Sequence, residues 1–279
     1  MPPWQGRPDG TAPPHYRPVR KPEHQLPAMD ELQGRVAIVT GAASGIGRGV
    51  AELFAREGAA GLALADIQAS PLQNLASDLR KRPGCDLLVS ETDVSDPGQV
   101  DRMVQATADR FGRIDILVNN AGICPMVPWD HTTLESWNRM LSVNLTSAFL
   151  CSKAVLPHMK KRKFGRLVHI SSVGAFVGSV TGHVGYGVSK AGVIALSKYL
   201  AKQFSGDGIL SNAIAPGSID TPLAEAFGEE NLQRYVEASL VRRQGTPREI
   251  AEAVLFLAGP RSSYVTGSTM HVNGGSLLI

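Results

Sequence analysis

The sequence predicts an α/β fold in which a parallel sheet is covered by helices on both faces. From Gly34 onward, short aliphatic runs alternate with longer amphipathic runs. Strands that are buried on both faces have this continuously apolar character. The 279 residues are 43% hydrophobic, enough for one large core. We find no internal repeat, and we expect a single domain over residues 32–279.

Seven short runs are predicted to be strands of this sheet. In chain order they are 35–40, 61–66, 86–90, 114–119, 166–171, 209–215 and 269–273. Between them lie helical patterns at about 46–58, 71–81, 97–111, 134–161, 184–204 and 247–258. Regular alternation of strand and helix indicates a parallel, doubly wound sheet.

The segment 222–246 interrupts the alternation between the sixth strand and the last helix. It carries Leu223, Phe227, Leu232, Tyr235 and Val236 in a polar background. Ligands bind beyond the carboxyl ends of parallel strands, and this segment leaves from such an end. We expect a small mobile lid; a plain surface helix is the alternative.

Residues 1–31 have a different composition from the rest. Eight of the 18 prolines fall between Pro2 and Pro27, without a periodic apolar pattern. We expect a flexible proline-rich tail, with an arm packed on its own domain or on a neighbouring subunit as the alternative. The tail lacks the apolar core of a signal peptide, and no later run is expected to be long enough to span a bilayer.

Charge, cysteine and histidine content argue against several classes of function. Lys plus Arg (28) exceed Asp plus Glu (25) by only three, too few to indicate a nucleic-acid partner. The cluster Lys160–Lys163 is expected to be a solvated helix end. The three cysteines lack metal-ligand spacing and favour a reduced, cytoplasmic location. The histidines also lack such spacing, so no metal is expected.

A glycine-rich turn follows the first predicted strand. The stretch TGAASGIGRG places Gly41, Gly45 and Gly47 between that strand and the next helix. Glycines allow a sharp turn and bring backbone N–H groups to a pyrophosphate at the helix N-terminus. Asp66 ends the second strand nineteen residues after Gly47, where a dinucleotide fold holds the adenosine ribose. We therefore predict a Rossmann-type dinucleotide-binding domain.

Asp66 also predicts which dinucleotide binds. A carboxylate accepts hydrogen bonds from ribose hydroxyls but repels a 2′-phosphate, and Ile67 and Gln68 supply no compensating cation. NAD is therefore favoured over NADP. Arg48, early in the next helix, is the objection to this interpretation, unless it only covers the helix surface.

Four motifs occur in a recognisable order. They are TGAASGIG (40–47), NNAG (119–122), YGVSK (186–190) and NAIAPGSIDT (212–221). With them the chain resembles the short-chain dehydrogenase/reductase family over about residues 32–279. The closing segment 242–275 is similar to that of the compact members, which include ketoacyl reductases and many alcohol and sugar dehydrogenases.

The resemblance implies a role for each motif residue. Its proton relay would be Asn144, Ser172, Tyr186 and Lys190. Besides Tyr186 and Lys190, the implied cofactor contacts are Gly41, Ser44, Gly45, Ile46, Gly47, Asp66, Asp93, Val94, Asn120, Ala121, Gly122, Pro216, Gly217, Ile219 and Thr221. Within this set, Asp93 and Val94 would contact the adenine. Ile219 and Thr221 would contact the nicotinamide carboxamide. Asn119 would brace the sheet.

The serine of the relay has two candidates. Ser171 and Ser172 are adjacent, and the fourteen positions from Ser172 to Tyr186 are one more than we expect from ketoacyl reductases. Strand alternation should turn the Ser171 side chain away from the site, so we choose Ser172.

The spacing of Tyr186 and Lys190 suggests the chemistry. Residues four apart share one helix face. Tyrosine has a pKa near 10, and a positive charge about 4 Å away contributes roughly 4 kcal/mol at an effective dielectric constant of about 20. We therefore expect Lys190 to lower the phenol pKa, so that Tyr186 exchanges a proton with substrate near physiological pH. Ser172 would hold the substrate oxygen, and Asn144 a water linked to Lys190.

The substrate pocket is expected to be mostly apolar. Its walls should come from 123–129, 174–178, the His183 region and the lid, with Met126, Val127, Trp129, Phe176, Val177 and Phe227 as the apolar groups. Such a pocket suits a secondary alcohol or ketone of some size. Arg242 and Arg243 leave an anionic substrate possible. For His183, placement at the surface is the alternative to a place beside the substrate.

Three functions are compatible with these features. The leading one is an NAD-dependent dehydrogenase of a secondary alcohol, polyol or sugar hydroxyl. A NADP-dependent 3-ketoacyl-thioester or ketone reductase is the second, with Asp66 against it. A non-catalytic dinucleotide-binding regulatory module is the third, with the intact Ser172, Tyr186 and Lys190 against it. Analogy with the family implies a homotetramer, and we expect neither a nucleic-acid nor a membrane partner.

Overall fold

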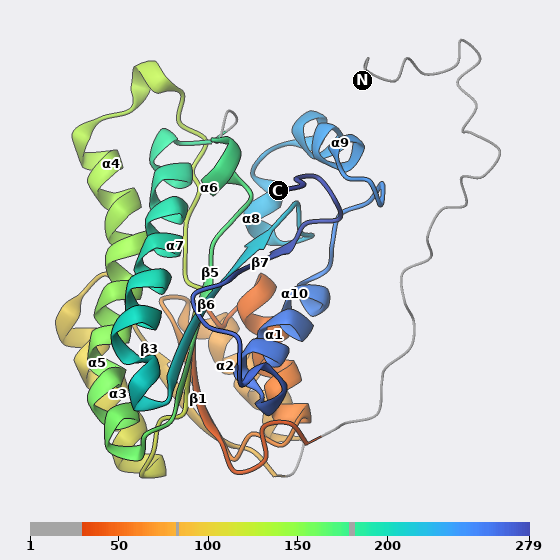
Figure 1. Ribbon diagram of the computed structural model, residues 1–279. Helices are drawn as coiled ribbons and strands as arrows, with labels where there is room; N and C mark the ends of the chain where they lie inside the picture. The colour runs from red at the N-terminus through yellow and green to blue at the C-terminus, as the bar shows by residue number, and fades with distance from the viewer. Residues whose placement is uncertain (1–29, 82–83, 179–181) are drawn as a thin grey trace.

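The computed structural model describes residues 30–81, 84–178 and 182–279. Seven parallel strands form one sheet in the order β3-β2-β1-β4-β5-β6-β7 (Figure 1). They are β1 Val36–Thr40, β2 Gly61–Asp66, β3 Asp86–Glu91, β4 Ile116–Asn119, β5 Gly165–Ile170, β6 Ile209–Pro216 and β7 Thr269–Val272. The predicted doubly wound, seven-stranded parallel sheet is confirmed.

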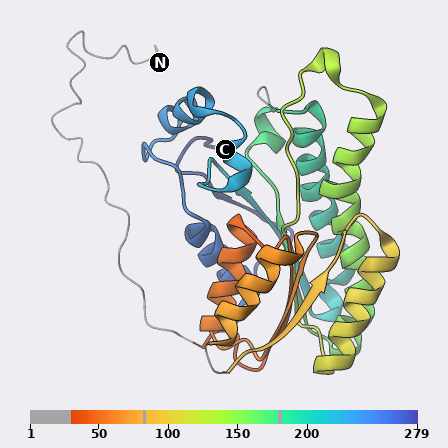
Figure 2. The same cartoon turned by 180° about the vertical axis from the view of Figure 1, so that it is seen from behind.

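Helices cover both faces of the sheet. They are α1 Gly45–Arg56, α2 Ala69–Arg80, α3 Pro97–Phe111, α4 Leu134–Leu141, α5 Ser147–Arg162, α6 Gly174–Val177, α7 Val184–Phe204, α8 Pro222–Glu225, α9 Glu229–Ala238 and α10 Pro247–Ala258. One face carries α1, α2 and α10, and the other carries α3, α4, α5 and α7 (Figures 1 and 2). The bounds of α3, α7 and α10 agree with the predicted ranges.

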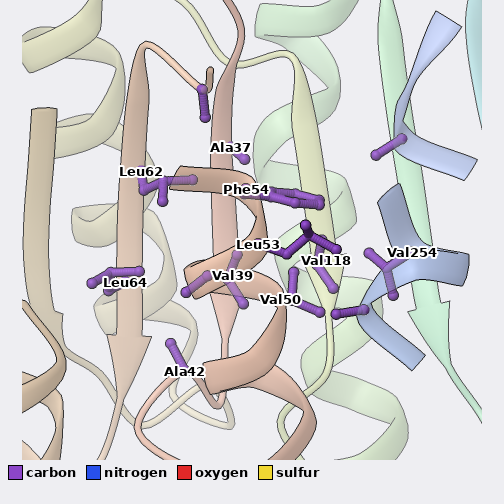
Figure 3. Close-up of a cluster of buried hydrophobic side chains, with 14 of the residues drawn as sticks. Ala37, Val39, Ala42, Val50, Leu53, Phe54, Leu62, Leu64, Val118 and Val254 are labelled. Atoms are coloured by element: carbon purple, nitrogen blue, oxygen red, sulfur yellow. The ribbon is translucent and has the colours of Figure 1, made fainter. Parts of the chain in front are cut away.

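Each face of the sheet has its own apolar core. Ala37 and Val39 of β1 point into the core beneath α1 and α10, where Phe54 packs (Figure 3). Ile38, between them, belongs to the opposite core, together with Met103 of α3. This alternation is why every residue of β1 is buried and why its sequence is apolar throughout. Each large side chain buried in this way contributes about 1.5–3 kcal/mol.

The strand order places the site. After β3 at one edge, the chain returns to β4 beside β1, so the connections leave β1 and β4 in opposite directions. A crevice opens at such a switch point, beyond the carboxyl ends of the strands. The glycine-rich turn and the NNAG motif follow these two strands, so the topology brings them together.

The predicted helix 134–161 is not one regular α-helix. A π-helical turn at Ser142–Thr146 separates α4 from α5. Asn144 in this turn donates to the Ile123 carbonyl at 2.9 Å and accepts from the Ile123 N–H at 2.8 Å. Its side chain is therefore held by the loop after β4, and such π turns are frequent at functional sites.

The helical segment Leu134–Arg162 corrects the expectation that no run after the tail is long enough to span a bilayer. Taken together, Leu134–Arg162 has 29 residues with a mean hydropathy of 1.2 in its most apolar window, enough by length and composition to cross a membrane. Half of that window is buried inside the protein, on the face of the sheet. We interpret it as the core helix of a globular fold.

The segment 222–246 contains two helices, α8 and α9, rather than one. Its ends are joined, because the Gly245 N–H donates to Ser218 O and the Asp220 N–H donates to Gly245 O, both at 2.9 Å. The segment therefore leaves the sheet and returns at one place. Its predicted mobility stays a prediction.

The predicted tail, residues 1–31, lies outside the described residues except for Asp30 and Glu31. Glu31 is ion-paired with Arg261 at 2.5 Å, and Leu32 is completely buried. Glu31 therefore already belongs to the folded domain, one residue before the predicted boundary.

Candidate active site

A cleft of about 440 Å³ opens beyond the carboxyl ends of the strands. All the catalytic and cofactor-binding residues that the resemblance implied line it except Gly47 and Asn144. Residues from 41 to 235 along the chain therefore meet in one place. The two exceptions lie immediately behind the wall of the cleft.

The glycine-rich turn is shaped by close backbone contacts. Gly41 and Gly45 have φ values of 65° and 52°, in the left-handed region that favours glycine. A Cβ at Gly47 would lie 2.0 Å from the Gly41 carbonyl oxygen. Gly47 thus lets α1 pack against the turn, and does not itself face the cleft.

The N-terminus of α1 fits a pyrophosphate group. Ser44 is the N-cap, but its side chain makes no capping hydrogen bond, and the first turn contains no acidic residue. The N–H groups of a first helical turn have no partner within the helix and carry partial positive charge. Since Gly45 and Ile46 line the cleft here, this helix end could hold an anionic group of a dinucleotide.

Asp66 is held rigidly at the end of β2. Its Oδ2 accepts from the Ala43 N–H and its Oδ1 from the Gln68 N–H, each at 2.9 Å, and the residue is 8% exposed. Arg48 is engaged elsewhere, with Glu52 at 2.8 Å and Asp78 at 3.6 Å. Arg48 does not line the cleft, and its side chain lies on the surface of α1.

Thr40 is a site residue that the sequence analysis missed. Its hydroxyl accepts from the N–H groups of Asn120 at 3.1 Å and Ala121 at 3.2 Å, and donates to Val118 O at 3.2 Å. The Asn120 amide donates back to the carbonyls of Thr40 and Gly41. These bonds join the ends of β1 and β4. A threonine in an apolar strand is common, so only its position before the glycine turn could have indicated this.

Asn119 braces the sheet, as the resemblance implied. Its amide donates to Ser152 at 3.2 Å and lies 3.1 Å from Nδ1 of His169, whose Nε2 is 3.2 Å from the Ser211 hydroxyl. Burial lowers the pKa of His169 to about 4, so the ring is neutral. These contacts connect α5 with β4, β5 and β6.

Tyr186, Lys190 and Ser172 meet where β5 faces α7. Lys190 Nζ donates to Ile170 O at 2.9 Å and lies 5.8 Å from the centre of the Tyr186 ring. The Ser172 side chain hydrogen-bonds Tyr186 and accepts from the Gly174 N–H at 3.0 Å. Ser171 instead donates to Lys190 O at 2.9 Å inside the protein. Of the two serines, Ser172 is the one beside Tyr186.

The pKa values of the pair differ from the expectation. Burial raises the pKa of Tyr186 to about 12, against the opposing effect of the Ser172 hydrogen bond. Burial also lowers the pKa of Lys190 to about 8. The prediction that Lys190 lowers the phenol pKa is therefore wrong in this structure. The reason is that removal from water penalises both charged forms, while the ammonium is directed at Ile170 O.

Asn144 stands behind the cleft, next to Lys190. A Cβ at Gly122 would lie 3.2 Å from Asn144 Oδ1 and 3.3 Å from Lys190 Nζ. Gly122 therefore packs closely against both side chains, of which Lys190 also lines the cleft and Asn144 does not. Because the Asn144 amide already binds the Ile123 backbone, its first role in this structure is to hold the loop after β4.

The substrate end of the cleft is only partly as predicted. Val177 and Phe227 line it, and Leu223 and Tyr235 of the lid line it as well. The remaining predicted wall residues, Met126, Val127, Trp129 and Phe176, do not line it. Trp129 is 75% exposed and Phe176 packs on His271, with ring centres 4.9 Å apart. The loop after β4 therefore turns outward beyond Ile123.

The positions of His183 and Arg243 also correct expectations. His183 is neither beside the substrate nor at the surface: it is fully buried, caps α7 by accepting from the Gly185 N–H at 2.9 Å, and contacts Ser136 at 3.0 Å. Arg243 is paired with Glu249 at 2.6 Å. Neither Arg242 nor Arg243 lines the cleft, so neither is placed to bind an anionic substrate.

Comparisons with known proteins agree with this geometry. A family model described as enoyl-(acyl carrier protein) reductase matches residues 41–276. The chain is 40% identical over 250 residues to the 3-oxoacyl-[acyl-carrier-protein] reductase FabG of Vibrio cholerae, covering 89% of this chain and 99% of the relative. It is 39% identical over 248 residues to the FabG of Thermotoga maritima, covering 88% and 99%. It is 38% identical over 258 residues to the oxidoreductase UcpA of Salmonella typhimurium, covering 90% and 97%.

The chain belongs to the short-chain dehydrogenase/reductase family, as its motifs indicated. It is an oxidoreductase of that family, whose cofactor is a nicotinamide dinucleotide. Within the described part of the chain, no group of three or more His, Cys, Asp or Glu residues is arranged to hold a metal ion.

Proposed function

We propose that the protein is an NAD-dependent oxidoreductase that interconverts a secondary alcohol and a ketone on a largely apolar carbon skeleton. The observation that carries the proposal is one cleft lined at one end by Asp66 and at the other by Ser172 and Tyr186. Leu223, Phe227 and Val177 make the substrate end apolar. Alcohols, polyols and sugar hydroxyls are the candidate substrate groups.

The protein residues position the substrate and move its proton. When bound, the nicotinamide supplies the acceptor or the donor of the hydride. Tyr186 exchanges the proton with the substrate oxygen, and Ser172 holds that oxygen. The pKa of Tyr186 is raised to about 12, so the phenol is protonated at neutral pH, as an ordinary tyrosine is, and it holds its proton more tightly. This shift favours neither direction of the reaction.

The preference for NAD rests on Asp66. Its carboxylate lines the cleft and is held by two N–H groups, so it cannot easily turn away from a 2′-phosphate. The cations among the described lining residues are Arg139 and Lys190, and Arg139 is already 3.6 Å from Asp93. A 2′-phosphate beside Asp66 would therefore be repelled. Replacing Asp66→Asn should raise kcat/KM with NADP relative to NAD by about tenfold or more.

A second candidate is a reductase of 3-oxoacyl thioesters. It is favoured by the printed function of the Vibrio cholerae and Thermotoga maritima relatives and by the description of the matching family. The resemblance implies NADP for that reaction, which Asp66 disfavours. The two candidates therefore differ in both substrate and cofactor.

Steady-state kinetics tests the proposal. The wild-type enzyme would be assayed with NADH and NADPH on simple ketones and on an acetoacetyl thioester of N-acetylcysteamine. We expect NADH to be preferred, and Tyr186→Phe to lose at least about 100-fold in kcat while still binding the cofactor. A strong preference for NADPH and the thioester would replace the first candidate with the second. Full activity of the Tyr186→Phe variant would rule out both.

We also propose a homotetrameric assembly and a cytoplasmic location. Phe149 on α5, and Val188 and Tyr199 on α7, are exposed apolar side chains on the long helices near Asn144 and Tyr186. They support the homotetramer expected by analogy, which light scattering on the purified protein would test. The three cysteines are free thiols, which supports a cytoplasmic location.

A further inference from the structure

The lid brings a second phenol to the active-site cleft. Helix α9 lies at the same end of the sheet as α6 and α8 (Figure 1). Its half-buried residues, Asn231, Leu232, Tyr235 and Val236, share one side of the helix. From this side, Tyr235 lines the same cleft as Ser172 and Tyr186.

The ring of Tyr235 is oriented by the lid itself. It meets the ring of Phe227 edge to face, with centres 6.0 Å apart and planes at 71°. Pro222, Leu223 and Ala224 of the lid and Val177 of α6 also line the cleft. The Tyr235 hydroxyl is therefore a polar group at an otherwise apolar end of the cleft. A few such polar groups in an apolar pocket usually decide how a ligand is oriented.

Tyr186 and Tyr235 line the same cleft, so a substrate whose reacting oxygen lies at Tyr186 occupies the space that the Tyr235 side chain also borders.

We infer that Tyr235 is a specificity-determining residue that hydrogen-bonds a second oxygen of the substrate. The substrate class is then a ketone or alcohol with a further hydroxyl or carbonyl oxygen near the reacting carbon. The inference rests on the proposed function. A hydroxyketone and a 3-oxoacyl thioester share this chemistry, so the experiment includes both.

The test compares matched ketones in the wild-type enzyme and in Tyr235→Phe. The probes are cyclohexanone, 2-hydroxycyclohexanone and the acetoacetyl thioester of N-acetylcysteamine, reduced with NADH. The phenylalanine keeps the ring contact with Phe227 and removes only the hydroxyl. We expect the wild type to prefer at least one probe with two oxygens over cyclohexanone. Tyr235→Phe should lower that preference, as a ratio of kcat/KM values, by about 5- to 10-fold.

Tyr264→Phe is the matched control, because Tyr264 is fully exposed and does not line the cleft. It should leave the preference as in the wild type. Equal loss on all three probes in Tyr235→Phe would overturn the inference while the proposed function stands, and so would a wild-type enzyme without preference. If the wild type reduces none of the probes, the proposed function fails together with the inference. The probe that depends on Tyr235 identifies which source of the second oxygen the site accepts.

Discussion

Helices α1 and α10 lie side by side on one face of the sheet, yet their N-termini are built differently (Figures 1 and 3). At α10, the Thr246 hydroxyl accepts from the Glu249 N–H at 3.3 Å and the Glu249 carboxylate accepts from the Thr246 N–H at 2.8 Å. At α1, the N-cap Ser44 makes no such bond. The two helix starts are in contact, since a Cβ at Gly49 would lie 3.2 Å from Pro247.

The difference shows how one fold divides its helix ends between stability and binding. A capping box satisfies the first N–H groups of a helix from within the chain. A helix N-terminus without a capping box leaves its first N–H groups for a ligand. The free-energy cost of leaving them without a partner is recovered only when an anion binds. We therefore expect the α10 start to contribute to the free energy of unfolding, and the α1 start to contribute to cofactor binding.

The largest effect should come from filling the space at Gly47. In Gly47→Ala the new Cβ meets Gly41 O, so the turn or α1 must move. We expect the free energy of unfolding to fall by about 3 kcal/mol, and cofactor affinity by at least about tenfold. Urea unfolding and fluorescence titration with NADH measure the two changes. Gly206→Ala, where a Cβ meets nothing within 4 Å, is the control and should change neither. An unchanged affinity in Gly47→Ala would remove the distinction between the two helix starts.

Removing the charge of Glu249 should be the next largest effect. The hydrogen bond from Arg243 is the main cause that lowers the pKa of Glu249 from 4.5 to about 2. A carboxylate with a lowered folded-state pKa stabilises the fold above its unfolded pKa, and this contribution is lost as the pH falls from about 4.5 toward 2. We expect Glu249→Gln to lower the free energy of unfolding by about 2 kcal/mol at pH 7. The difference from the wild type should shrink between pH 4.5 and pH 3 in urea titrations. A difference that is constant with pH would contradict the ion-pair explanation.

Loss of the Thr246 cap should also lower the free energy of unfolding, by less than the loss of the Glu249 charge. Thr246→Ala removes the acceptor for the Glu249 N–H. We expect a decrease of about 1 kcal/mol in the free energy of unfolding, measured by urea unfolding. NADH affinity should stay at the wild-type value, since Thr246 does not line the cleft. A weakened affinity would mean that the α10 start also serves the cofactor.

Ser44→Ala is expected to have the smallest effect. In contrast to Thr246→Ala, it should change NADH affinity and leave stability nearly unchanged. Because Ser44 makes no capping bond, stability should change by less than about 0.5 kcal/mol. The hydroxyl lines the cleft at the helix start, so NADH should bind roughly threefold more weakly in the same titration. A loss of stability equal to that of Thr246→Ala would show that Ser44 caps α1 after all.

The elements were predictable because their signals are local. Strands of the sheet are apolar runs, since each face of β1 is buried, and α7 and α10 have periodic patterns with clear ends. The π turn at Asn144 was not predictable in this way. The Asn144 side chain in this turn binds the backbone of Ile123, twenty-one residues away in the chain, so a long-range contact accompanies the turn.

The residues of the site also differ in how well the sequence predicted their positions. The motif residues lie together in one cleft, as their order predicted, because strand ends and helix starts carry them to one edge of the sheet. The pocket walls were less predictable: Trp129 and Phe176 are apolar but turn elsewhere, whereas Tyr235 lines the cleft. Hydrophobicity says that a side chain avoids water, not which of two apolar surfaces it joins.

By itself, the amino-acid sequence determined the strands and helices, the parallel winding, the glycine turn with Asp66, and the pairing of Tyr186 with Lys190. These follow from periodicity and from the conformations that single residue types allow. Only the tertiary structure decided that His183 is a buried cap, that Glu249 engages Arg243, and that burial raises the pKa of Tyr186. Each of these depends on which distant groups share a place, and on how much water is removed there, which no local pattern encodes.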